Sequence, residues 1–157
     1  KYVIIGKKYS DSYFDQINKM IMDLGVAEKV FILTSVDDEK ELEQYYHEAE
    51  LFFLMSLNVR HELEGFGLVY LEAAMRGLPI VSSLGSGVED AVNNGRNGIL
   101  VPQYDHQAAA DAIIKILSDK ELKENMSKAS LLWVKNFQWE DQIKKYIGIY
   151  NDLKKRR

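Results

Sequence analysis

The stretch "EGFGLVYLEAAMRGLPIVSS", residues 64–83, contains a loop with two glycines, an apolar helical pattern and a largely apolar strand in direct succession. The spacing predicts a helix that follows Gly67, runs to about Arg76 and is ended by Gly77, because glycine readily closes a helix. Residues 78–83 form a short apolar run that predicts a buried strand. Loop, helix and strand in this order indicate one unit of a parallel α/β sheet.

The same alternation of strands and helices is expected along the rest of the chain. Further strands are predicted at 2–6, 29–35, 50–56 and 97–101. Helices are predicted within 10–25, from Asp37 or Asp38 through Tyr45, within 88–95, and at 105–118, about 119–135 and about 139–153. The sequence therefore predicts an α/β fold: a three-layer, Rossmann-like, doubly wound parallel sheet with additional C-terminal helices. In such sheets, ligands bind beyond the carboxyl ends of the strands.

Composition narrows the classes of function. The chain has 157 residues, enough for one domain with a core, and its formal net charge of −4 argues against a nucleic-acid binder. It has no cysteine, which excludes disulfides, thiolate metal sites and cysteine nucleophiles. No apolar run reaches the roughly 20 residues that span a bilayer, and no signal peptide is visible. Because the chain starts at Lys1, directly before an apolar strand, we expect it to be an excised domain or a fragment.

The loop and helix start at residues 64–69 have the features of an anion site. Gly65 and Gly67 leave the backbone near the helix start free of side chains. The first helical residues expose N–H groups without an intrahelical partner, and the helix dipole adds partial positive charge there. We therefore expect a phosphate group at the N–H groups of residues 66–69.

Two glutamates bracket this site, Glu64 in the loop and Glu72 within the helix. Helical spacing is expected to place Glu72 on a buried stripe formed by Leu68, Leu71 and Met75. A carboxylate in that position needs hydrogen-bond donors, and the hydroxyls of a ribose or sugar are suitable. An internal salt bridge to Arg60 or Arg76 is an equally good explanation. The residues by themselves favour a ligand with hydroxyls on both sides of a phosphate, which describes a nucleotide sugar.

Four segments of the chain carry a family resemblance: "EGFGLVYLEAAMRGLPIV", "SSLGSGVEDAVNNGRNGILVP", "DDEKELEQYYHEAELFFLMS" and "FQWEDQ". The first resembles the E-x7-E signature of the group 1 (family 4) retaining glycosyltransferases of the GT-B fold. The others are similar to the segments around that signature, in the same order. The resemblance implies a two-domain transferase, of which residues 1–157 form one domain, the C-terminal, nucleotide-sugar-binding half.

The resemblance also implies roles for individual residues. Glu64 would bind hydroxyls of the transferred sugar and is the predicted catalytic residue, and Glu72 would bind the ribose hydroxyls. The other predicted donor-binding residues would hold the sugar and diphosphate, lie under the nucleobase, or neighbour the phosphates. They are, in that order, Phe66, Gly67, Leu68 and Val69; Thr34, Ser35 and Val36; and Gly85 and Gly87.

The chain departs from the family pattern at its start. It begins at what resembles the second strand, so the N-terminal acceptor domain and the first strand–helix unit, with its basic pair, are expected to be absent. We therefore expect residues 1–157 alone not to catalyse sugar transfer.

We expect no cofactor and no metal, because no Asp-x-Asp motif occurs in the sequence. The substrate would be a nucleotide-diphosphate sugar, and the reaction transfer of a hexosyl group to a glycan or lipid-linked acceptor with retained configuration.

Location and pathway are expected from the family alone: polysaccharide or glycolipid biosynthesis in the cytoplasm, with peripheral association at the inner membrane face left open. Alternatives are an epimerase-like GT-B domain acting on sugar nucleotides, or a non-catalytic nucleotide-binding module. A dinucleotide-dependent oxidoreductase is disfavoured, because the segment "GKKYSD" after the first strand lacks the Gly-x-Gly-x-x-Gly motif.

We expect His47, His61 and His106 to be surface or helix residues rather than ligands. We expect Trp133, Phe137 and Trp139 to be core or helix-packing residues.

Overall fold

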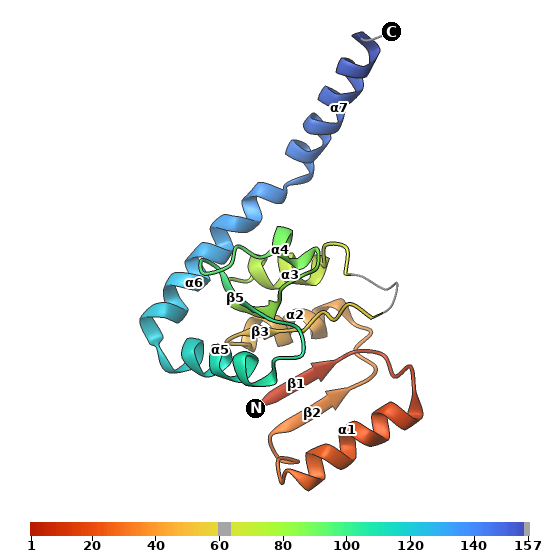
Figure 1. Ribbon diagram of the computed structural model, residues 1–157, viewed down its shortest axis with the longest axis vertical. Helices are drawn as coiled ribbons and strands as arrows, with labels where there is room; N and C mark the ends of the chain where they lie inside the picture. The colour runs from red at the N-terminus through yellow and green to blue at the C-terminus, as the bar shows by residue number, and fades with distance from the viewer. Residues whose placement is uncertain (60–63, 156–157) are drawn as a thin grey trace. The chain divides into compact units, whose positions relative to one another are not determined.

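The structure is a computed structural model that describes residues 1–59 and 64–155. The chain forms two compact units, Lys1–Tyr45 and Tyr46–Arg157, and the boundary falls within the helix α2, Glu39–Glu48. Figure 1 shows both units and labels most of their helices and strands.

The first unit is a parallel strand pair joined by a helix. Strand β1, Tyr2–Ile5, pairs with β2, Val30–Leu33, and the helix α1, Asp11–Asp23, connects them. The backbone N–H of Tyr13 donates to Ser10 Oγ at 3.3 Å and caps the start of α1. Gly25 follows the end of α1 with a φ of 65°, as expected for the predicted stop. None of residues 1–45 is buried.

The second unit is built on a three-stranded parallel sheet in the order β3-β4-β5. Its strands are Phe52–Phe53, Ile80–Ser83 and Gly98–Val101. The helix α3, Leu68–Met75, connects β3 to β4, and the short helix α4, Val88–Ala91, connects β4 to β5.

Two apolar clusters cover the two faces of this sheet. Ile80 and Leu100 pack with Tyr70 of α3 and with α4. Val81 and Val101 belong to the other cluster, with buried residues of α5 and α6. Because successive strand residues point to opposite faces, neighbours such as Ile80 and Val81 divide between the clusters. The sheet is thus the middle layer of three.

Four helical segments complete the second unit: α5, His106–Ser118; α6, Lys120–Trp133; the 3-10 helix η1, Val134–Phe137; and α7, Trp139–Lys155. Asp105 caps α5 by accepting from Ala108 N at 2.9 Å. Within residues 1–59 and 64–155, no helix is long and apolar enough to cross a membrane.

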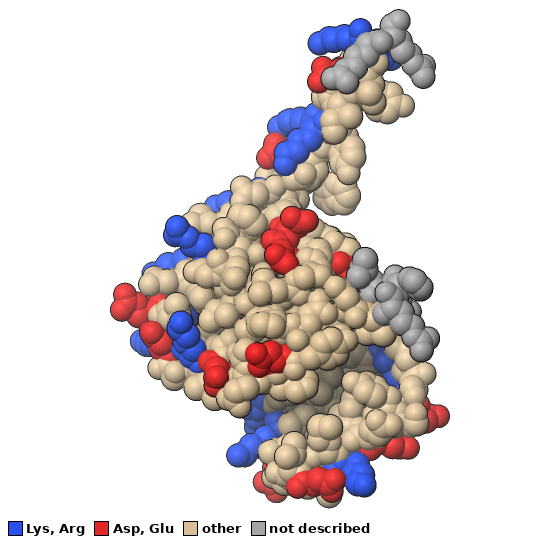
Figure 2. Space-filling model, viewed as in Figure 1, with Lys and Arg blue, Asp and Glu red and all other residues tan. Residues whose placement is uncertain are grey.

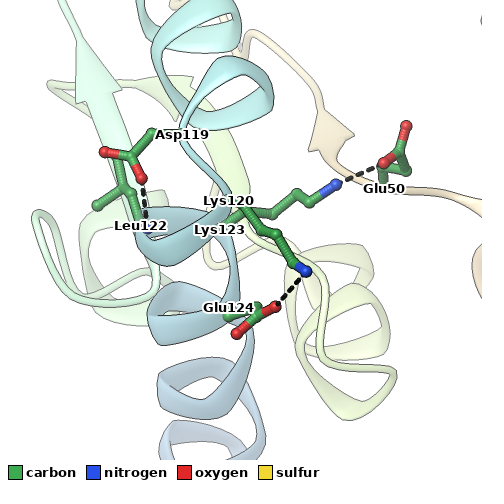
Figure 3. A network of polar contacts seen from close by, with 6 residues as sticks. All are labelled: Glu50, Asp119, Lys120, Leu122, Lys123 and Glu124. Atoms are coloured by element: carbon green, nitrogen blue, oxygen red, sulfur yellow. Dashed lines mark hydrogen bonds and ion pairs between the residues drawn. The ribbon is translucent and has the colours of Figure 1, made fainter.

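Charged side chains connect the start of α6 to the segment before β3 (Figure 3). Asp119 accepts from Leu122 N at 2.9 Å, and Lys120 pairs with Glu124 at 3.8 Å. Lys123 reaches Glu50, 2.5 Å away. Glu50, Lys123 and Glu124 line an open hollow that also includes the residues just before β4. This hollow therefore lies at the amino ends of the strands, opposite the edge where the sequence predicts a ligand.

The predicted fold class, a parallel α/β arrangement with C-terminal helices, is confirmed, and so is the order of its elements. The predicted strand at 50–56 is too long, since β3 contains only Phe52 and Phe53. Leu54 N still donates to Val81 O at 3.2 Å, after which no further ladder bond to β4 is formed by the described residues. The hydrogen-bonded strands form one sheet of two and one of three.

Candidate functional site

The start of α3 is shaped by Gly67. This residue precedes the helix with a φ of 76° and makes no side-chain capping bond. A Cβ atom at Gly67 would lie 2.5 Å from the ring of Tyr70. Both the left-handed backbone and the neighbouring ring therefore require glycine here. The first turn of α3 is left without a side-chain cap, as an anion site at a helix end requires.

The predicted buried stripe of α3 is wrong. Leu68 and Met75 are 68% and 60% exposed, while Tyr70, Ala73 and Ala74 are buried. Periodicity identified an apolar helix but not its inner side, because α3 is apolar on most of its circumference. Small alanines and one large ring fill the space against the sheet and α6 instead.

A buried network of hydroxyls fixes α3 to the strands below it. Tyr70 OH lies 2.7 Å from Ser56 Oγ and donates to Leu54 O at 3.1 Å. Ser82 Oγ lies 2.9 Å from Tyr70 OH. Burial raises the pKa of the Tyr70 hydroxyl, so it stays protonated and serves as a donor. The network anchors the helix start to the carboxyl ends of β3 and β4.

Gly87 holds the loop after β4 against the loop that contains Glu64. The N–H of Gly87 donates to Glu64 O at 3.0 Å, and a Cβ at Gly87 would collide with Gly65 O. Only glycine permits this approach of two backbones. Gly87 thus fixes the backbone from which the Glu64 side chain, itself half-buried, extends.

Side chains missed by the sequence analysis join the three loops that follow β3, β4 and β5. Asn58 Nδ2 donates to Gly85 O at 2.6 Å, and Asn58 N donates to Gln103 Oε1 at 2.9 Å. Glu89 Oε1 accepts from Gly85 N at 2.6 Å, so this predicted phosphate neighbour has its N–H engaged. The only sequence signal for Asn58 and Gln103 was their position at the carboxyl ends of strands.

Glu72 is half-buried, and its carboxylate accepts a hydrogen bond from the hydroxyl of Tyr46 at 3.1 Å. Arg76 Nη1 donates to the backbone oxygen of Glu72 at 3.0 Å. Arg60, the other cation considered for Glu72, lies outside the described residues. No spacing rule connects Tyr46 with a residue 26 positions away, so the sequence analysis missed it.

The predicted site residues are divided between the two units. Glu64 lies in the loop before α3, residues 66–69 form the start of this helix, and Glu72 lies further along it. Gly87 donates its N–H to Glu64 O. All of these residues, and Gly85, belong to the second unit. Thr34 and Ser35 are exposed and Val36 is half-buried after β2, in the first unit.

The predictions for histidines and aromatic residues had mixed outcomes. His47 and His106 are exposed, as expected, and His61 lies outside the described residues.

The aromatic rings of Trp133 and Phe137 pack edge to face, with their centroids 5.6 Å apart. The ring of Phe137 also packs on that of Phe66 in the candidate site, with centroids 5.5 Å apart. These contacts confirm the predicted packing role of Trp133 and Phe137. Trp139 is 77% exposed, so its assignment to the core or to helix packing is wrong. It stands at the start of α7, beyond the reach of either cluster.

The profile of the family described as "Glycosyl transferases group 1" matches residues 1–133. The chain belongs to the group 1 glycosyl transferases. It is 32% identical over 137 residues to a D-inositol 3-phosphate glycosyltransferase of Corynebacterium urealyticum, a match that covers 87% of this chain and 31% of that protein.

Two further relatives of this group 1 chain are also sugar-transferring or sugar-phosphate-forming enzymes by name. It is 32% identical over 130 residues to a GDP-mannose-dependent alpha-(1-6)-phosphatidylinositol monomannoside mannosyltransferase of Mycolicibacterium smegmatis, covering 81% of this chain and 34% of that protein. The sucrose-phosphate synthase structure from Thermosynechococcus elongatus matches with a TM-score of 0.78 and 26% identity, covering 99% and 39% of the two chains. The chain spans less than two-fifths of the length of each relative. The resemblance to the GT-B glycosyltransferases is thereby confirmed.

Proposed function

We propose that the protein containing this chain is a retaining glycosyltransferase and that the chain binds its nucleotide-sugar donor. The main support for this proposal is that the chain belongs to the group 1 family. In addition, Glu64 precedes the start of α3 and Glu72 follows it. The GDP-mannose-dependent relative supports a nucleoside-diphosphate sugar as the donor class.

The start of α3 would bind the diphosphate. The backbone N–H groups of Phe66, Gly67, Leu68 and Val69 are the proposed donors, and the positive end of the helix dipole favours the anion. Gly67 has no side chain to occupy this position. Gly85 and Gly87 would adjoin the phosphates, with Gly87 acting through its bond to Glu64 O.

The two glutamates would bind hydroxyls on either side of the diphosphate. Glu64 would accept from hydroxyls of the transferred sugar, since its backbone is anchored beside the α3 start. Glu72 would accept from the ribose hydroxyls. Thr34, Ser35 and Val36 would lie under the nucleobase; this assignment rests on the family pattern alone.

The proposed reaction exchanges one glycosidic bond for another. The bond between the anomeric carbon and the diphosphate oxygen breaks, and the acceptor oxygen bonds to the same carbon on the same face. The acceptor hydroxyl proton passes to the departing diphosphate. N–H groups of α3 would stabilise the negative charge that develops on the leaving group. We propose that no metal is required, and that the acceptor is a glycan or a lipid-linked sugar at the cytoplasmic side of the membrane.

A donor screen on the full-length protein tests this function. Transfer or slow hydrolysis is expected with one nucleoside-diphosphate sugar, and NMR of the product should show the anomeric configuration of the donor. Glu72→Ala should raise the donor KM, and Glu64→Ala should chiefly lower kcat. Glu121→Ala, an exposed glutamate of α6, is the matched control and should change neither constant. A product of inverted configuration, or unchanged kinetics for both site variants, would refute the proposal.

A further inference from the structure

The Tyr46 hydroxyl contacts the carboxylate assigned above to the ribose. Tyr46 is half-buried near the end of α2, and its hydroxyl donates to Glu72 Oε2 across 3.1 Å. Burial first, and then the charge of Glu72, raise the pKa of this hydroxyl to about 12. The hydroxyl therefore keeps its proton at neutral pH and remains a hydrogen-bond donor.

The Tyr46 ring is held by its neighbours. It stacks on Phe52 of β3 with ring centroids 6.1 Å apart, and the guanidinium of Arg76 lies 5.0 Å from its centre. Arg76 is in turn bonded to the Glu72 backbone at 3.0 Å. Tyr46 and Glu72 are thus fixed with respect to each other by an aromatic contact, a cation–π contact and a hydrogen bond.

We propose that Tyr46 is a positioning residue that orients the Glu72 carboxylate for two neighbouring hydroxyls of the donor's ribose. This inference rests on the proposed function and deepens it. A carboxylate has two oxygens with about four acceptor positions, and Tyr46 occupies one of them on Oε2. The remaining positions can accept both hydroxyls of a vicinal diol. A carboxylate fixed in advance loses less rotational freedom on binding than a free one.

Calorimetric titration of the full-length protein with pairs of nucleotides tests the inference. Each pair consists of a nucleoside diphosphate (UDP, GDP or ADP) and its 2′,3′-dideoxy counterpart, which lacks the ribose hydroxyls. Tyr46→Phe keeps the ring and removes only the hydroxyl. Tyr45→Phe, at the adjacent half-buried tyrosine, is the matched control.

Loss of one orienting hydrogen bond should raise the Kd of the ribonucleotide roughly three- to tenfold in Tyr46→Phe. In the same variant, the Kd of the dideoxynucleotide should change less than about twofold, because the Glu72 carboxylate then has no ribose hydroxyl to bind. In a Glu72→Gln background, Tyr46→Phe should have no further effect on ribonucleotide binding.

If Tyr46→Phe raised the Kd equally for both nucleotides of a pair, Tyr46 would have a general structural role and the inference would be overturned. An unchanged ribonucleotide Kd in Tyr46→Phe would also overturn it. These results leave the proposed function intact when the wild-type protein still binds the ribonucleotide. If no nucleoside diphosphate binds the wild type, the proposed function fails and this inference fails with it.

Discussion

Individual glycines around the candidate site have different physical roles. Gly67 combines a φ of 76° with a close neighbour, the Tyr70 ring. Gly65 has no heavy atom within 4 Å of the position that a Cβ would take. Both belong to the same quoted motif, yet only the three-dimensional structure separates a glycine that the backbone needs from one that it tolerates.

Gly67→Ala should destabilise the protein by about 1–3 kcal/mol, because a left-handed alanine is strained and its Cβ meets Tyr70. Gly65→Ala is the matched control and should change the free energy of unfolding by no more than about 0.5 kcal/mol. Urea denaturation followed by circular dichroism measures both. Equal effects of the two substitutions would contradict this account of Gly67.

The raised pKa of Tyr46 should make the free energy of unfolding fall at alkaline pH. Its pKa is raised from 10.0 to about 12 in the folded state, so the native protein binds this proton more tightly than the unfolded chain does. The stabilisation is therefore complete below pH 10 and is lost as the pH rises through about 12. The absorbance of tyrosinate at 295 nm, compared between wild type and Tyr46→Phe, should differ by a transition centred near pH 12. A difference centred near pH 10 would refute the assignment.

Among the elements, α5 shows how one helix face forms the core. Ala109, Ala112 and Ile116 are buried at spacings of three and four, while Ile114 on the other side is 62% exposed. The helix α7 has a similar amphipathic pattern, but none of its described residues is buried. On the face drawn in Figure 2, basic and acidic side chains alternate along α7. An amphipathic pattern thus predicts a helix without identifying what the helix packs against.

Two substitutions of the same residue type test the face of α5. Ile116→Ala removes a fully buried side chain and should cost about 2–5 kcal/mol of unfolding free energy. Ile114→Ala removes the same atoms from an exposed position and should cost less than about 1 kcal/mol. Thermal and urea denaturation measure the difference. If Ile114→Ala were the more damaging change, the orientation of α5 would be wrong.

Across the whole molecule, the buried residues are concentrated in the second unit. All four residues of β4 are buried and β4 pairs on both sides, whereas no residue of the first unit is buried. Stability within a protein follows such differences in burial, because local opening exposes less apolar surface where little is buried.

Hydrogen exchange should therefore separate the two units. Amides of β4 are expected to exchange most slowly, and amides of β2 faster, although both strands form ladder hydrogen bonds. Mass spectrometry of peptides from residues 30–33 and 80–83 measures the two rates. Equal protection of these peptides would show that the first unit unfolds only together with the second.

The sequence by itself determined the order and type of the elements and the family to which the chain belongs. These depend on local signals: apolar periodicity, glycine stops and a motif in which Glu64 and Glu72 stand a fixed distance apart. The length of β3 and the inner side of α3 were predicted wrongly, because both depend on what packs against them.

Only the tertiary structure decided which residues surround the candidate site. It joined Tyr46 to Glu72, placed Gly87 against the Glu64 loop, and connected Asn58 to Gln103. These contacts bring together residues that are far apart along the chain. Neither propensity nor periodicity encodes them, since such contacts form only when separate elements pack and their polar groups must find partners.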